Sequence, residues 1–288
     1  MVRAAVKYLA RNPSKVTQVL RDPKELYSRL YNKLDAHVAR VLHFRHRTPE
    51  YSAAADWSER LHKALGHDGP CREEQAFSKL WSAVTARLEA QGFTVGPESY
   101  FAWNDGDPAL TRAIWCIVRH LRPERVVETG VGHGITTRFI LEAMQLNSYG
   151  QLWSIDLPPV DPAVAAQVGV AVEGPCESRW TLLRGTSRHL LPRLLRELGA
   201  IDLFIHDSQH THHNVRFELR QAQRAVRPRG LIVVDDSDTN AVFAKVVRDS
   251  PEVSLVCEAE PVRPDLRRFN KKGLFGVILP RRSSATIH

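Results

Sequence analysis

From residue 107 onward, short apolar runs alternate with stretches of helical period, and this alternation restricts the fold more than any other feature of the sequence. Short apolar runs bounded by turn residues are typical of buried strands. Strands that alternate with helices form a parallel sheet with helices on its faces. The sequence therefore predicts an α/β protein with a doubly wound, mostly parallel sheet of seven strands. These begin at Val126 and then cover 151–156, 180–184, 201–207, 231–235, 253–258 and 273–279.

The first predicted strand ends in a glycine-rich turn. Residues 128–134 read Glu-Thr-Gly-Val-Gly-His-Gly and lead into a helix predicted for 135–144. Glycine adopts backbone angles closed to other residues and lets a ligand lie against the main chain, and the first N–H groups of the helix face the space above the turn. The interval between Gly132 and Gly134 is one residue shorter than in a dinucleotide-binding turn, which favours a different ligand. A tight turn without a ligand is the alternative.

Asp156 closes the second predicted strand, 26 residues after Gly130. In a doubly wound sheet this position lies beside the glycine turn, where a carboxylate can accept both hydroxyl groups of a ribose. A strand-end aspartate can instead cap a loop, so both interpretations stay open.

Acidic and imidazole side chains follow the fourth and fifth strands, at the sheet edge where open α/β sheets bind ligands. His210 is a candidate general base because an imidazole titrates near neutral pH; the alternative is a histidine that caps a helix or faces solvent. Asp207, Asp235 and Asp236 offer oxygen ligands of the kind that Mg²⁺ or Mn²⁺ prefers. Such an ion would lower the pKa of a bound hydroxyl group. Without a metal, one aspartate would cap the next helix and another would orient a histidine.

Together these motifs resemble the class I S-adenosylmethionine-dependent methyltransferases, in particular a branch of small bacterial O-methyltransferase-like proteins. The resemblance covers about residues 110–280 and includes Asp-x-x-His after the fourth strand, a Pro-x-Gly turn and Asp-Asp after the fifth strand. It implies a Rossmann-like methyltransferase fold and methyl transfer from S-adenosylmethionine to a hydroxylated small molecule or sugar. The cofactor contacts that it implies are Glu128, Gly130, Gly132, Gly134, Asp156, Ser187 and Asp207.

Two routes to an activated acceptor follow from the resemblance. In the first, His210 removes the hydroxyl proton with the help of Asp207. In the second, a divalent ion bound by Asp207, Asp235 and Asp236 lowers the pKa of the bound hydroxyl group. Metal-dependent catechol-type relatives have Asp-Asn after the fifth strand, and Asp236 stands in the place of the asparagine. This departure leaves both routes open.

The sequence of residues 1–95 predicts helices with clear start and stop signals. The resemblance does not extend to these residues. Apolar stripes occur at 2–9, 26–41, 57–65 and 77–88, and the whole net charge of +8 lies in residues 1–47. This basic segment is compatible with a solvated helix face, an attachment to an acidic partner or anionic membrane, a lid, or a homo-oligomer contact. We expect a helical extension at 1–95 and a methyltransferase domain at 96–288.

Composition restricts the partners and the location. Residues 48–288 hold equal numbers of basic and acidic side chains, which argues against a catalytic domain that binds nucleic acid. The four cysteines stand far apart without a Cys-x-x-Cys pair, so neither a zinc site nor a disulfide framework is expected. We expect a soluble, cytoplasmic protein with reduced thiols, because neither a signal-peptide core nor a membrane-spanning apolar run is apparent.

Two other functions remain open from the sequence. A nicotinamide-dependent oxidoreductase could use a similar sheet, although the glycine spacing argues against it. A non-catalytic module could keep the fold and bind a partner through its basic helices. The fold does not determine the acceptor. The residues expected to select it lie in the N-terminal third and in the loops 100–107 and 263–272.

Overall fold

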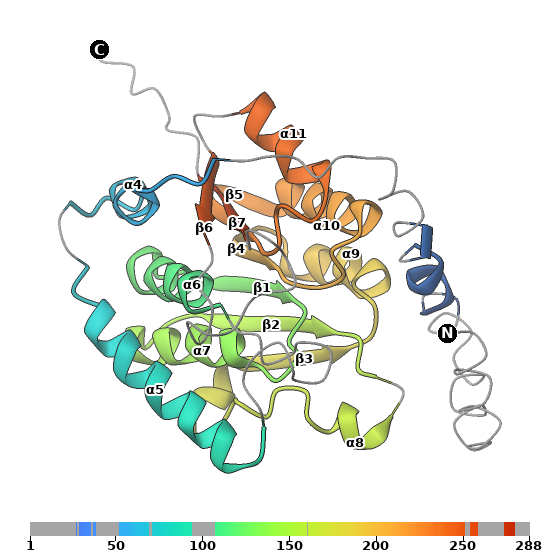
Figure 1. The fold of residues 1–288 in the computed structure, drawn as a ribbon, viewed down its shortest axis with the longest axis horizontal. Coiled ribbons are helices and arrows are strands. Elements are labelled where there is room, and N and C mark those ends of the chain that lie inside the picture. Colours follow the sequence, from blue (N-terminus) through green and yellow to red (C-terminus); the bar gives the residue numbers. More distant parts are fainter. Residues whose placement is uncertain are drawn as a thin grey trace.

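One sheet of seven strands forms the middle of the molecule (Figure 1). The computed structural model describes residues 27–38 without 28 and 36, 52–68, 71–93, 107–250 without 160, 254–258 and 274–279. The strands are β1 (Arg125–Thr129), β2 (Gln151–Asp156), β3 (Trp180–Arg184), β4 (Ile201–His206), β5 (Val226–Val234), β6 (Ser254–Glu258) and β7 (Leu274–Ile278). Their order across the sheet is β3-β2-β1-β4-β5-β7-β6.

The strand directions confirm the predicted doubly wound, mostly parallel sheet. Strands β1 to β5 run parallel to one another, whereas β7 lies antiparallel between β5 and β6. The chain moves outward from β1 to β2 and β3, then returns to place β4 and β5 on the other side of β1. The carboxyl end of β1 is therefore a topological switch point, the position at which such sheets bind ligands.

Helices cover both faces of the sheet. On one face lie α6 (Pro108–Leu121) and α7 (Ile135–Asn147), and on the other lie α9 (Ser187–Leu198), α10 (His212–Ala225) and α11 (Ala241–Asp249). Successive strand residues point to opposite faces, so Val126 packs in the first of the two cores and Val127 in the second. Two short helices, α8 (Pro162–Ala165) and η2 (Pro175–Arg179), connect β2 to β3.

Helix α6 begins where the sequence predicts. The Asp107 carboxylate accepts a hydrogen bond from the Ala109 backbone N–H at 2.9 Å, and Pro108 occupies the first helical turn. A proline fits there because the N–H that it lacks would have no partner within the helix.

The start of β5 differs from the prediction. The sequence predicts a helix to Val226, a stop at 227–230 and a strand from Leu231, whereas α10 ends at Ala225 and β5 already begins at Val226. The pairing of β4 with β5 is irregular between Ile201 and Leu203. Such an irregularity lets a proline belong to a strand without donating to the ladder.

Two N-terminal helices pack on the face that α6 and α7 cover. These helices are α4 (Trp57–Ala64) and α5 (Glu74–Ala90), and each ends just before its predicted glycine stop. Trp57 contacts Phe275 of β7 with ring centroids 5.4 Å apart, and Phe77 contacts Phe139 of α7 at 5.0 Å. Both helices therefore share the core of the sheet.

Some predicted features lie outside the described residues, namely the apolar stripe at 2–9 and the loops at 100–106 and 263–272. Within the part of the chain that the structure describes, no helix is both long and apolar enough to cross a bilayer.

Replacing Phe139 by Ala should lower the free energy of unfolding by about 3–5 kcal/mol, because the change removes a fully buried ring and leaves a cavity. Its ring contacts those of Phe77, Trp81 and Trp115. Urea denaturation measures the change. Leu146→Ala is the matched control, since Leu146 lies exposed on the same helix and should have little effect. An equal loss in both variants would contradict this assignment of the core.

Candidate active site

The glycine turn after β1 packs tightly against the protein's own backbone. Gly130, Gly132 and Gly134 have φ values of 87°, 52° and 83°, a region that favours glycine. A Cβ atom on Gly130 would lie 1.9 Å from the carbonyl oxygen of Asp207, and one on Gly134 would lie 2.9 Å from the Cα of Gly169. Internal packing therefore requires two of the three glycines, whatever ligand the turn binds.

Asp156 and the glycine turn lie on the same rim. Oδ2 of Asp156 accepts hydrogen bonds from the backbone N–H groups of Val131 at 2.8 Å and Gly132 at 3.3 Å. Burial raises the pKa of Asp156, although these two donors oppose the shift. The side-chain hydrogen bonds of Asp156 to the described residues all use Oδ2, so Oδ1 remains an acceptor at the edge of the turn.

Glu128 lies beneath the turn and is almost completely buried. Its Oε2 accepts hydrogen bonds from Thr137 of α7 at 2.8 Å and from Ser154 of β2 at 2.6 Å. Burial raises its pKa to about 7 despite these hydroxyl donors. Glu128 thus links β1 to its neighbours, and its predicted contact with a cofactor stays a prediction.

The strand ends bring Asp207, His210 and Asp235 together. One ligand atom from each lies within 4.8 Å of the others. His210 Nε2 is 3.8 Å from Asp207 Oδ1 and 3.7 Å from Asp236 Oδ2. Burial and the neighbouring carboxylates of Asp235 and Asp236 raise the pKa of Asp207 well above its ordinary value. A proton or a cation bound here would relieve this repulsion between like charges.

The loop after β5 fixes the position of His210. The backbone carbonyl of His210 accepts hydrogen bonds from Asn240 Nδ2 at 3.1 Å and from Thr239 Oγ1 at 3.4 Å. Asn240 also caps α11, because its Oδ1 accepts from the Val242 N–H at 3.0 Å. The two loops that carry the cluster are therefore joined directly.

Glu218 of α10 accepts several hydrogen bonds beneath this edge of the sheet, and the sequence analysis did not identify it. The residue is fully buried, and burial alone would raise its pKa, but His206 and several hydroxyl donors lower the pKa to about 2. Its position on α10 is a signal that could have identified it, since Asn214, Glu218 and Ala222 follow one another at intervals of four on the buried face. Hydrogen bonds reach its carboxylate from Thr129, Ser187, His206, Ser208 and Asn214.

Ser187 is one of these donors, at the first position of α9. Its hydroxyl group thus serves the buried network in this structure. Its predicted contact with adenine stays a prediction.

Part of the basic N-terminal segment also reaches this edge. Residues 29–35 are helical and lie beside the loops that follow β2 and β4 (Figure 1). Asp35, only 7% exposed, accepts hydrogen bonds from Thr211 Oγ1 and from His213 Nδ1, the latter at 2.9 Å. Arg29 donates to the carbonyl oxygen of Pro158 at 3.0 Å. Sequence periodicity predicts the helix but not these contacts, which join segments far apart along the chain.

Comparison with known families agrees with this geometry. A family model described as a methyltransferase domain matches residues 127–237, from β1 to the loop after β5. A candidate O-methyltransferase of Mycobacterium sp. (strain JLS) is 30% identical over 153 residues, which are 53% of this chain and 66% of that relative. The chain thus spans just under two thirds of the length of this relative. From β1 to the loop after β5, the chain is therefore similar to methyltransferase domains.

Solved structures described as O-methyltransferases also align with the chain. A candidate O-methyltransferase from Klebsiella pneumoniae has 18% identity and a TM-score of 0.45, with 77% of this chain and 94% of that chain covered. An O-methyltransferase from Bacillus cereus in complex with SAH has 13% identity and a TM-score of 0.46, with 70% and 90% covered.

The Glu218→Gln variant should lose about 3–5 kcal/mol of stability at pH 7, because His206 loses its buried anionic partner. The ordinary pKa of a glutamate is 4.5 and that of folded Glu218 is about 2, so its stabilising effect is complete above pH 4.5. This effect is lost as the pH falls towards 2, and the difference between wild type and variant should shrink over that range.

Urea denaturation at several pH values tests this dependence. Glu197→Gln is the control, because Glu197 forms an exposed pair with Arg193 and should change stability little at any pH. A deficit in Glu218→Gln that stays constant down to the lowest pH would contradict the lowered pKa.

Proposed function

We propose that this protein transfers the methyl group of S-adenosylmethionine to a hydroxyl oxygen of a small molecule or sugar. One observation carries the proposal: the carboxylate that ends β2 binds the amides of the glycine turn after β1, beside the Asp and His cluster of β4 and β5. The methyltransferase-domain match over 127–237 supports the same function and favours neither a nicotinamide-dependent oxidoreductase nor a non-catalytic module.

The residues at the turn fit the proposed cofactor. Oδ1 of Asp156 would accept a ribose hydroxyl group, and the turn around Gly132 would face the methionine part. The N-cap of α7 is Gly134, which has no side chain to occupy the first N–H groups of the helix, so these remain available to a carboxylate. When bound, the cofactor supplies a methyl group on a sulfonium centre, and its neutral thioether departs.

His210 has the surroundings that a general base requires. Its Nε2 faces the carboxylates of Asp207 and Asp236, which would stabilise the imidazolium formed when His210 takes the acceptor proton. Its Nδ1 is buried and has no hydrogen-bond partner within the described part of the chain. The protein must align the acceptor with the methyl group and deprotonate the acceptor oxygen.

A divalent cation is the second route to the same result. The crowded carboxylates of Asp207 and Asp235 fit an oxygen-binding ion such as Mg²⁺ or Mn²⁺, with Asp236 as the third predicted ligand. His210 itself belongs to the group of atoms within 4.8 Å. If it coordinates the ion, its nitrogen is no longer available as a base, so the two routes are distinct.

The helical residues 29–35 support a role in acceptor selection. They contact the loops on both sides of the proposed transfer site through Arg29 and Asp35. We propose that the extension at 1–95 forms one wall of the acceptor pocket of the domain at 96–288. Attachment of residues 1–47 to an acidic partner or membrane, and homo-oligomer formation, are further proposals for the same segment.

All four cysteines are free of disulfide bonds. Because reduced thiols are typical of the cytoplasm, we propose a cytoplasmic location.

Gly132→Arg should abolish binding of S-adenosylmethionine, because an arginine side chain would fill the space above the turn. Isothermal titration calorimetry measures the binding, and circular dichroism checks the fold. Gly92→Arg is the matched control, since Gly92 also has a positive φ but faces open space and should leave binding unchanged. Micromolar binding that persists in Gly132→Arg, or that is absent in the wild type, would refute the proposed function.

His210→Ala should slow formation of S-adenosylhomocysteine by about 10² or more and leave cofactor affinity intact, as expected for loss of a general base. The rate is measured with the best acceptor from a panel of phenols and sugars. His189→Ala removes an exposed histidine of α9 and should have no effect. Full activity in His210→Ala would exclude this base.

Chelation separates the two routes in the same assay. Activity that survives EDTA in the wild type points to His210 as the base. Loss of activity with recovery on addition of Mg²⁺ points to the metal, with His210 as a neighbour or ligand.

A further inference from the structure

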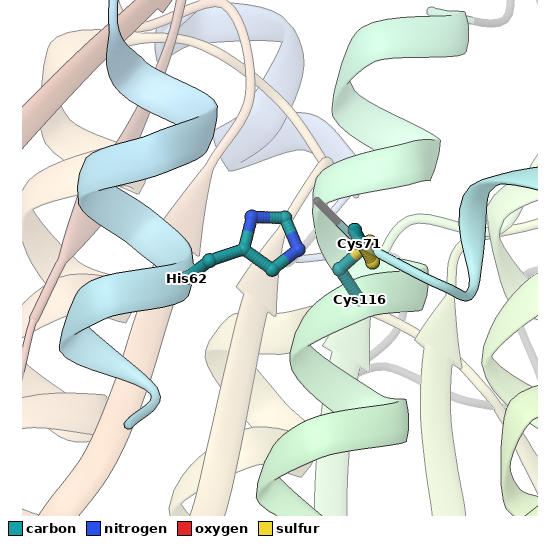
Figure 2. Close-up of side chains that lie close together, drawn as sticks. All are labelled: His62, Cys71 and Cys116. Carbon is teal, nitrogen blue, oxygen red and sulfur yellow. Dashed lines mark hydrogen bonds between the residues drawn. The ribbon is translucent and has the colours of Figure 1, made fainter. Parts of the chain in front are cut away.

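A second group of metal-ligating side chains lies away from the candidate active site, where the N-terminal helices meet α6. It consists of His62 of α4, Cys71 before α5 and Cys116 of α6 (Figure 2). The imidazole ring of His62 points from its helix towards the two cysteines (Figure 2). One ligand atom of each residue lies within 4.8 Å of the others. His62 and Cys116 are buried, and Cys71 is half-buried.

The protonation of His62 suits metal binding. Its Nδ1 lies 2.7 Å from the carbonyl oxygen of Ser58, which can only accept, so Nδ1 carries the hydrogen and Nε2 carries a free electron pair. His62 is 5% exposed, and its buried Nε2 has no hydrogen-bond partner among the residues that the structure describes. A histidine that donates one ring N–H to a backbone carbonyl and directs the other nitrogen at an ion is the usual arrangement of a metal ligand.

Two distances from Cys71 are close to the edges of a coordination tetrahedron. Cys71 Sγ lies 3.5 Å from Cys116 Sγ and 3.5 Å from Nε2 of His120. Bond lengths of about 2.3 Å for Zn–S and about 2.0–2.1 Å for Zn–N give edges of roughly 3.8 Å between two sulfur atoms and roughly 3.6 Å between sulfur and nitrogen. His120 follows Cys116 by one turn of α6, so both side chains lie on the same face of the helix. His67 packs against the His120 ring with centroids 3.9 Å apart.

We propose that His62, Cys71 and Cys116 bind Zn²⁺ and that His120, whose Nε2 lies 3.5 Å from Cys71 Sγ, completes a four-coordinate site. Two thiolates and two neutral imidazoles are a ligand set that selects zinc over oxygen-preferring ions. On binding, each thiol releases its proton to solvent and its sulfur donates an electron pair, so the occupied site has no net charge. No electron is transferred. The ion would fasten α4 and the chain before α5 to α6, the helix that leads into β1.

This proposal differs from the expectation, drawn from cysteine spacing, that the cysteines form no zinc site. Cys71 and Cys116 are 45 residues apart, so the short Cys-x-x-Cys spacing by which sequences reveal zinc sites is absent. A disulfide between the same two sulfur atoms is the rival arrangement. It would leave His62 Nε2 buried without a partner.

The test measures zinc in the full-length protein after purification with a thiol reductant and dialysis. Elemental analysis by mass spectrometry should find about one zinc per chain in the wild type. Cys71→Ser and His62→Ala should lose it. Cys176→Ser is the matched control, because Cys176 is also a buried free cysteine but lies outside the cluster, and it should retain zinc. Asp235→Asn should also retain zinc, which separates this site from the strand-end carboxylates.

A second measurement does not depend on the folding of the variants. Replacement of zinc by Co²⁺ in the wild type should produce the thiolate-to-cobalt charge-transfer band and the visible bands of tetrahedral cobalt. Bands of octahedral cobalt without charge transfer would overturn the proposal. So would zinc retained in a Cys71→Ser/Cys116→Ser double variant, or metal-free protein in which peptide mapping finds a Cys71–Cys116 disulfide. Failure of cofactor binding in Gly132→Arg has no bearing on these outcomes.

Discussion

The close approach of the β1 turn to the end of β4 is the contact on which the candidate site depends. The backbones of Gly130 and Asp207 can touch only because residue 130 has no side chain. The same turn is held from the other side by Asp156, through the amides of Val131 and Gly132. The backbone contact at Gly130 and the side chain of Asp156 thus fix the ends of β1, β2 and β4 relative to one another. The side chains that would meet a cofactor and an acceptor are carried on these three ends and on that of β5.

Two carboxyl groups near this edge have pKa values displaced in opposite directions. Burial disfavours the charged form of both. Glu218 is surrounded by hydrogen-bond donors and by His206, which keep it ionised, whereas Asp207 lies beside the carboxylates of Asp235 and Asp236 and has a raised pKa. The first group is a permanent anion that shapes the loop after β4. The second can change its charge when a proton or a cation arrives, which is what an activating site requires.

The N-terminal third is attached to the seven-stranded sheet at separate places. Helices α4 and α5 bury Trp57 and Phe77 against the face that α6 and α7 cover. Residues 29–35 instead lie at the carboxyl edge, where Asp35 binds the loop after β4. The proposed zinc site would add metal coordination bonds between α4 and α6. This arrangement lets one segment stabilise the sheet while another lies beside the proposed transfer site.

Local sequence was sufficient for much of the fold. The strands from β1 to β4, the start of α6 at Asp107-Pro108 and the glycine turn follow from periodicity, capping and backbone restriction, which depend on residues adjacent in the chain. The prediction of where β5 starts was wrong, because Pro228 in isolation is a signal that ends a helix or strand. Only the irregular pairing of β5 with β4 accommodates this proline.

The sequence by itself also identified the strand-end residues Asp156, Asp207, His210 and Asp235, because the order of strands and helices indicates which ends share an edge. Only the tertiary structure decided that Glu218 is the buried centre of that edge, that Asp35 reaches it, and that Cys71 lies beside Cys116. The physical reason is that a periodic pattern records that a face is buried but not which segment buries it. The partner of a buried polar group is determined by contacts between segments distant in the sequence, which form only when the chain folds.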